Sequence, residues 1–179
     1  MKKKNSITLG IIIVLILIVS IVLVLFLDTD KKTNINTYNK VNLNGYEFTI
    51  NDNYKYKYLD DKKYAVLENE EFLTSYIYIS NLEYSELIRK TSSYTNMGSE
   101  ELDSSIEEMK IGSYLSFINV KKVYYEDVDK EYELVIILIK VNEKKTFVFQ
   151  YEIEINDKND EILEDIKESL STIEEVNKE

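Results

Sequence analysis

The sequence predicts an α+β protein: an N-terminal transmembrane helix, then one domain with a mostly antiparallel sheet flanked by helices, in the order ββββ-αα-βββ-α. Three observations support this prediction. Residues 7–27 form an uncharged apolar run. Several later segments alternate apolar and polar side chains, as half-buried strands do. Three others repeat apolar residues every three or four positions, which is typical of one buried helix face.

The apolar run Ile7 to Leu27 has the length of a bilayer-spanning helix, roughly 31 Å at 1.5 Å per residue. Lys2, Lys3 and Lys4 precede it and favour a cytoplasmic N-terminus. We therefore expect a signal anchor, with residues 1–6 in the cytoplasm and the rest outside a cell membrane crossed once. The alternative, a cleaved signal peptide, has a shorter apolar region and a small-residue cleavage site, which Leu-Phe-Leu-Asp does not provide.

Residues 28–40 are polar and are interpreted as a linker, so the extracytoplasmic domain is expected over residues 41–176. Asn44-Gly45 is a turn signal. It precedes the first clearly alternating segment, residues 46–50. Three more strands are expected in the first half of the domain, over residues 54–58, 64–67 and 75–79.

Two consecutive helices are expected next. Ser80 and Glu83 have the spacing of a capping box, which predicts the start of a helix. Its expected inner face carries Tyr84, Leu87, Ile88 and Thr91. A second helix is predicted from Ser99, because Glu100 follows in its first turn and apolar residues recur at helical spacing. The apolar residues expected on its inner face are Leu102, Ile106 and Met109.

The second half of the domain is predicted as a three-strand meander and a closing helix. The strands are expected over residues 115–125, 135–139 and 147–155, and the uninterrupted apolar run in the second indicates burial on both faces. The helix is expected from Asp160. Its apolar stripe consists of Ile162, Leu163, Ile166, Leu170 and Ile173.

Composition excludes several kinds of chemistry. The chain has no Cys and no His, so it offers neither a thiolate nor an imidazole as nucleophile, base or metal ligand. The formal net charge is −11. Three of the 22 basic residues precede the apolar run and all 33 acidic residues follow it, so residues 28–179 carry −14. Such a domain repels phosphate backbones, and we expect neither a nucleic-acid partner nor a cofactor.

One segment approaches a calcium-binding pattern. Asp157, Asn159, Glu161 and Glu168 occupy positions 1, 3, 5 and 12 of an EF-hand loop. Position 6 is Ile162, where such a loop requires Gly for its sharp turn. The same acidic residues are explained by the start of a helix, whose dipole favours them, so no metal site is predicted.

Catalytic motifs are equally sparse. Paired carboxylates are the chemistry of glycoside hydrolases, which makes a cell-envelope hydrolase the alternative function. The candidate pairs are Glu100/Glu101, Glu107/Glu108 and Glu152/Glu154. With 33 acidic residues such pairs are inevitable, and a solvated surface explains them. Gly98-Ser99 and Gly112-Ser113 lack the G-x-S-x-G nucleophile elbow, so no catalytic residue is assigned.

The 15 tyrosines are the unusual feature of the composition. Those on one side of each expected strand are Tyr54, Tyr56 and Tyr58, and Tyr76 and Tyr78. One interpretation packs their rings under helices with the hydroxyls at the rim. The other exposes them as an aromatic surface for a protein or glycan partner.

Two segments carry a resemblance to a known fold: residues 44–50 (NGYEFTI) and residues 162–173 (ILEDIKESLSTI). With the order of the expected elements, they make residues 43–175 similar to the PsbP-like α/β/α sandwich, named for a photosystem II subunit. Small secreted or anchored bacterial proteins also resemble it. Members usually continue the first segment into a Pro-containing turn, whereas this chain has Asn51-Asp52-Asn53 and no Pro. The resemblance implies a scaffold that binds proteins or small ligands, usually without catalysis.

Taken together, these observations predict a membrane-anchored, extracytoplasmic and non-catalytic domain. Its expected partner is a protein or small ligand at the cell surface. The sequence leaves the partner and the oligomeric state open.

Overall fold

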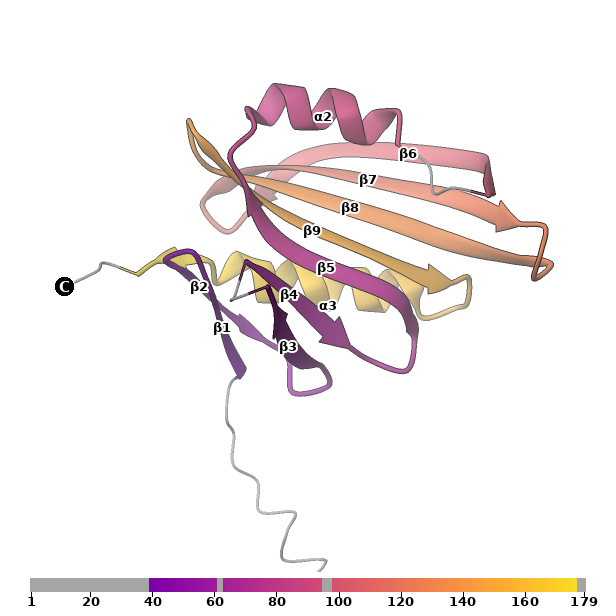
Figure 1. Ribbon diagram of the computed structural model, residues 1–179, viewed down its shortest axis with the longest axis horizontal. Coiled ribbons are helices and arrows are strands. Elements are labelled where there is room, and N and C mark those ends of the chain that lie inside the picture. Colours follow the sequence, from indigo (N-terminus) through magenta and orange to yellow (C-terminus); the bar gives the residue numbers. More distant parts are fainter. Residues whose placement is uncertain (1–38, 61–62, 95–97, 177–179) are drawn as a thin grey trace, which may run out of the picture. The chain divides into compact units, whose positions relative to one another are not determined.

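The computed structural model describes residues 39–60, 63–94 and 98–176. These residues form a mostly β domain with a seven-stranded antiparallel sheet, in the order β3-β4-β5-β9-β8-β7-β6, and a three-stranded sheet, β1-β2-β10 (Figure 1). The strands are β1 (Asn39–Leu43), β2 (Tyr46–Ile50), β3 (Lys55–Leu59), β4 (Tyr64–Glu68), β5 (Phe72–Ser80), β6 (Ser99–Ile111), β7 (Tyr114–Tyr125), β8 (Lys130–Asn142), β9 (Lys145–Glu154) and β10 (Glu174–Glu175). The helices are α2 (Tyr84–Ser92) and α3 (Asn159–Ser171).

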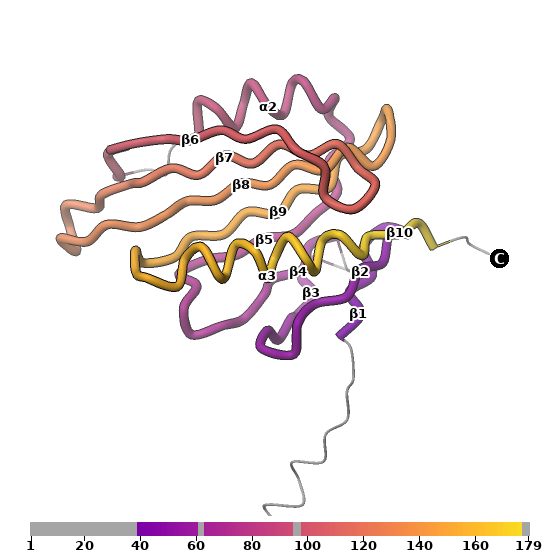
Figure 2. The backbone as a smooth tube through the Cα atoms, turned by 180° about the vertical axis from the view of Figure 1, so that it is seen from behind, coloured from indigo at the N-terminus to yellow at the C-terminus, as the bar shows by residue number. Residues whose placement is uncertain are grey.

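The two helices cover opposite faces of the large sheet (Figure 1). On one face, α2 buries Leu87 against a small core that includes Phe117 of β7 and Leu138 of β8. On the other face, α3 lies along the sheet, and its chain continues into β10 (Figure 2). This second, larger core joins the apolar stripe of α3 to the inner faces of β1 and β2. The stripe residues in that core are Ile162, Ile166, Leu170 and, just after the helix, Ile173.

The centre of the sheet confirms the meander predicted from the sequence. β8 lies between β7 and β9, and its residues 134–139 are all buried. Successive side chains of a strand point to opposite faces, so Leu134, Ile136 and Leu138 enter the α2 core. Val135, Ile137 and Ile139 enter the α3 core. The continuous apolar run therefore follows from burial on both faces.

The prediction of a second helix from Ser99 is wrong, and with it the α+β order ββββ-αα-βββ-α. Residues 99–111 form β6, the longer of the two edge strands of the large sheet, which pairs antiparallel with β7. Leu102 is 48 % and Ile106 56 % exposed, so they form no inner helical face. The turn at Gly112, with φ of +59°, directs the chain back along β6. The hydrogen bonds of this long hairpin outweigh the helix preference that the spacing of the apolar residues indicates.

Smaller differences concern the ends of elements. The strands β1 and β10 have no counterpart among the expected elements, and both pair with β2. The expected turn at Asn44-Gly45 is confirmed, with positive φ at both residues. The expected capping box is not: Glu83 is the N-cap and makes no side-chain cap bond. The Ser80 hydroxyl instead accepts a hydrogen bond from Leu82 N, at 3.2 Å.

Residues 7–27, where the transmembrane helix was predicted, lie outside the described residues. Across residues 39–60, 63–94 and 98–176, neither helix has the length and apolar character needed to cross a bilayer. The structure therefore gives no support to the expected transmembrane signal anchor or to the single-pass location in the cell membrane. Both expectations are corrected accordingly, and the function proposed below does not depend on them.

Candidate binding surface

One part of the sheet face that carries α2 presents a group of tyrosines. The helix α2 contacts β7 and β8, and Tyr78 of β5 packs at the border of the core that α2 forms with them. We call the tyrosines gathered there, Tyr64 of β4, Tyr76 and Tyr78 of β5 and Tyr94 just after α2, the tyrosine surface. Tyr64, Tyr76 and Tyr94 are 39 %, 44 % and 42 % exposed, so their rings are available to a partner.

Strand register places these rings side by side. Tyr64 and Tyr78 are direct partners across β4 and β5, and their ring centroids lie 5.6 Å apart. Tyr76 lies two residues before Tyr78 in β5 and therefore points to the same face of the sheet. The intervening Ile77 points to the α3 core and is fully buried. The alternation of β5 thus divides its side chains between a core and an open face.

Tyr78 connects the tyrosine surface to the α2 core. Its ring packs against the core that contains Leu87. Burial raises the pKa of the Tyr78 hydroxyl, and the neighbouring Tyr64 and Tyr94 raise it further. The hydroxyl is therefore neutral at physiological pH and serves as a hydrogen-bonding group. Large amphipathic rings held by a rigid sheet are typical of protein-recognition surfaces.

The tyrosines of the neighbouring strand behave differently. The side chain of Tyr54, just before β3, is buried and stacks on Phe72, with 5.7 Å between ring centroids. Burial raises its pKa to about 12. Tyr56 donates a hydrogen bond to Lys40 O, and Tyr58 accepts one from Asn42 N. These three tyrosines join β3 to β1 and to the core, so they have a structural role in packing. Tyr76, by contrast, is exposed and remains a candidate for binding a partner.

The calcium-like segment has no loop in the structure. The helix α3 begins at Asn159, so Asn159, Glu161 and Glu168 all lie on the helix rather than around a common centre. The Asn159 amide donates to Glu133 Oε2 at 3.0 Å. Among the described residues, no group of three or more acidic, Cys or His side chains is placed to hold a metal ion.

The candidate carboxylate pairs do not converge on a cleft. Glu107 and Glu108 are consecutive on β6, so their side chains project to opposite faces. Glu152 is buried and accepts a hydrogen bond from the Tyr125 hydroxyl at 2.6 Å, whereas Glu154 pairs with Lys130. These two pairs, within the described part of the chain, therefore do not support the hydrolase alternative.

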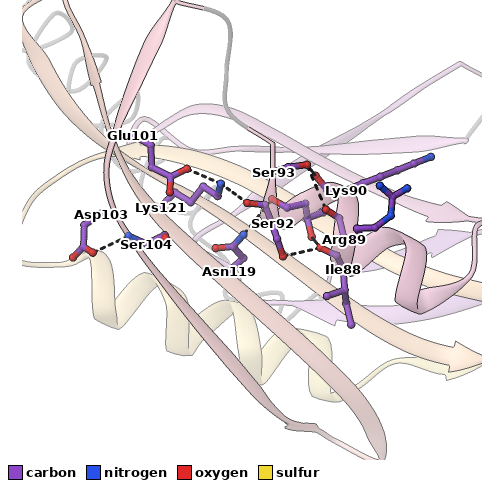
Figure 3. Close-up of polar contacts among 11 residues, drawn as sticks. Ile88, Arg89, Lys90, Ser92, Ser93, Glu101, Asp103, Ser104, Asn119 and Lys121 are labelled. Carbon is purple, nitrogen blue, oxygen red and sulfur yellow. Dashed lines mark hydrogen bonds and ion pairs between the residues drawn. The ribbon is translucent and has the colours of Figure 1, made fainter.

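A buried polar cluster that the sequence did not reveal lies at the C-terminal end of α2 (Figure 3). The Lys121 side chain is only 2 % exposed, and its ammonium donates to Ser92 O at 2.9 Å and to Glu101 Oε2 at 2.7 Å. The neighbouring Asn119 amide donates to Thr91 O at 3.2 Å. The Lys121 bond satisfies a carbonyl at the end of the helix, and the Asn119 bond adds to the one that Thr91 O accepts from Tyr94 N.

This cluster fastens α2 to the sheet and so determines where Tyr94 emerges. The hydrogen bond from Lys121 is the main cause that lowers the pKa of the Glu101 carboxyl. Sequence reasoning missed the cluster because Asn119 and Lys121 alternate with apolar residues, a pattern that normally indicates the solvent side of a strand. Only the packing of α2 turns this polar row into a buried one.

Neither a family model nor a curated protein matches the sequence. Among solved structures, a protein of Bacteroides thetaiotaomicron shares the fold, with a TM-score of 0.52 and 9 % identity over 75 % of this chain. The chain spans 46 % of the length of that protein.

Two other solved structures are similar. LpqN, which is involved in cell envelope biogenesis of Mycobacterium tuberculosis, gives a TM-score of 0.48 at 7 % identity, over 74 % of this chain and 83 % of LpqN. The Ran-binding protein Mog1p of Saccharomyces cerevisiae gives 0.43 at 12 %, over 74 % and 91 %. At these identities the likeness concerns the fold alone, and the class defined here is a sheet-rich domain with one helix on each face.

Proposed function

We propose that this protein is a non-catalytic binding domain that engages a protein partner through the tyrosine surface. The observation that carries the proposal is the set of tyrosine rings left about two-fifths exposed beside α2, on strands whose other face is core. Tyrosine supplies a large contact area with few rotatable bonds and a hydrogen-bonding tip, and it is enriched at protein interfaces.

The charge of the domain indicates which kind of protein fits. Residues 28–179 carry a formal charge of −14, which attracts basic proteins at long range. Exposed tyrosine rings also bind Lys and Arg side chains through cation–π contacts. We therefore propose a partner with a basic contact surface.

We also propose that the fold is the PsbP-like sandwich, because the large sheet is layered between α2 and α3. An experimental structure that does not superpose on a PsbP subunit would contradict this.

In-cell photo-crosslinking tests the binding proposal. A photoreactive residue is placed at position 64, 76 or 124, the last on the far strand β7 as a matched tyrosine control. We expect positions 64 and 76 to yield the same crosslinked protein, position 124 to yield none of it, and Tyr78→Ala to reduce the yield. Equal capture from position 124, or different proteins from positions 64 and 76, would overturn the proposal.

A further inference from the structure

The strand β6 ends the seven-stranded sheet and pairs only with β7 among the described residues. Its residues 100–108 are exposed without interruption. An edge strand presents a row of backbone N–H and C=O groups that have no partner in the sheet. β6 is therefore the longer of the two edge strands of the large sheet, 13 residues against five in β3.

The geometry of this edge suits an added strand. After the irregularity between Glu101 and Asp103, residues 103–111 pair with β7 in unbroken register. A stretch of this length exceeds a typical strand of about five or six residues. The chain has no Pro to block this edge, and β6 contains a single lysine, Lys110. Its acidic side chains protect the edge against strands of like charge, and an oppositely charged strand is not repelled.

Charge decides which occupant fits. β6 carries five acidic residues, Glu100, Glu101, Asp103, Glu107 and Glu108, of which Glu101 pairs with Lys121 and Glu107 lies 4.0 Å from Lys167. A second copy of this chain would bring the same carboxylates against them, and like charges on neighbouring strands are destabilising. A strand with Lys or Arg would instead gain opposite-charge pairs on both sides of Ile106, which is 56 % exposed and offers an apolar contact.

We propose that β6 is a β-augmentation site, at which a basic, extended segment of a partner protein pairs with residues 103–111 as an additional strand. Backbone hydrogen bonds supply the affinity of such sites and alternate side chains supply the specificity. The site does not depend on the tyrosine surface, because β6 and β4 are separated by four strands in the sheet order.

The test uses the full chain and a nine-residue peptide that alternates Lys and Val, matched in length to residues 103–111. Amide hydrogen exchange is measured with and without the peptide, at low and at high salt. We expect slower exchange along β6 and weaker binding at high salt, because salt screens the charge pairs. A peptide of the same sequence with N-methyl groups on alternate residues lacks the backbone N–H donors that would pair with β6. It should bind at least about tenfold more weakly than the unmodified peptide.

Matched variants localise the effect. The double variant E107K/E108K reverses two exposed glutamates of β6 and should abolish the slower exchange. The control E174K/E175K makes the same change of charge on β10 and should leave it intact. Thermal unfolding reports whether each variant remains folded.

Three outcomes would overturn the inference: slower exchange that maps outside β6, equal binding of the N-methylated peptide, or equal binding by E107K/E108K. A dimer of this chain that disappears in E107K/E108K would also overturn it, by making a second copy the occupant. Tyr76→Ala distinguishes the two proposals, because it should reduce crosslinking at the tyrosine surface and leave peptide binding at β6 unchanged.

Discussion

The Ser75 hydroxyl completes the pairing of β4 with β5 through Leu67. It accepts a hydrogen bond from Leu67 N at 2.8 Å and donates one to Leu67 O at 2.7 Å. Backbone register between these strands extends only over Tyr64–Ala65 and Ile77–Tyr78. The Ser75 side chain thus bonds the backbone N–H and C=O of Leu67 at a point where β5 provides no backbone partner. This contact holds β4 against β5 and keeps Tyr64 beside Tyr78.

Ser75→Ala should therefore destabilise the protein by about 2–3 kcal/mol, because it leaves a buried N–H and a buried C=O without partners. The measurement is the free energy of unfolding from urea denaturation. Ser113→Ala, at an exposed turn residue, is the control and should change it little. If both variants unfold alike, Leu67 has another partner in solution.

The buried ammonium of Lys121 makes a second prediction. Lys121→Met removes the donor to Ser92 O and Glu101 and should cost about 3 kcal/mol of unfolding free energy. The adjacent Lys122 is exposed, so Lys122→Met is a matched control expected to remain within about 0.5 kcal/mol of the parent. Chemical denaturation followed by circular dichroism measures both, and equal losses would contradict the role assigned to Lys121.

The same ion pair should make stability depend on pH. The pKa of Glu101 is lower in the folded protein than its ordinary value of 4.5, so the folded state binds this proton less readily than the unfolded state. Its contribution is complete above that ordinary value and is lost as pH falls through the folded pKa. Glu101→Gln should be less stable than the parent at pH 7, and the difference should vanish at low pH. A difference that stays constant between pH 7 and pH 3 would argue against the linkage.

The turn between β6 and β7 has a steric requirement for glycine. A Cβ added at Gly112 would lie 2.6 Å from Ser171 O, and φ there is +59°. Gly112→Ala should therefore cost more than the roughly 1 kcal/mol expected from a positive φ alone. Gly45→Ala is the control, since φ is +87° and nothing lies within 4 Å of the added atom. Differential scanning calorimetry should show the larger fall in melting temperature for Gly112→Ala.

Part of the candidate surface was predictable. The alternation Tyr76-Ile77-Tyr78 indicates a strand with aromatic rings on one side, and the structure confirms it. The same pattern in Tyr54, Tyr56 and Tyr58 leads to the core and to β1 instead. No local signal distinguishes the two sets, because the difference depends on where β1 and α2 pack.

By itself the sequence determined the elements whose signals are local. These are the Asn44-Gly45 turn, the strands β2, β8 and β9, and the amphipathic helix α3. It also determined the acidic charge and the absence of thiol and imidazole chemistry.

Only the tertiary structure decided that residues 99–111 form a strand, that Lys121 is buried and that Tyr64 and Tyr76 are exposed. Each of these depends on contacts between residues far apart in the chain, namely β6 with β7, α2 with the sheet, and β4 with β5. Hydrogen bonding and burial across such contacts outweigh the weak local preferences that a sequence pattern records.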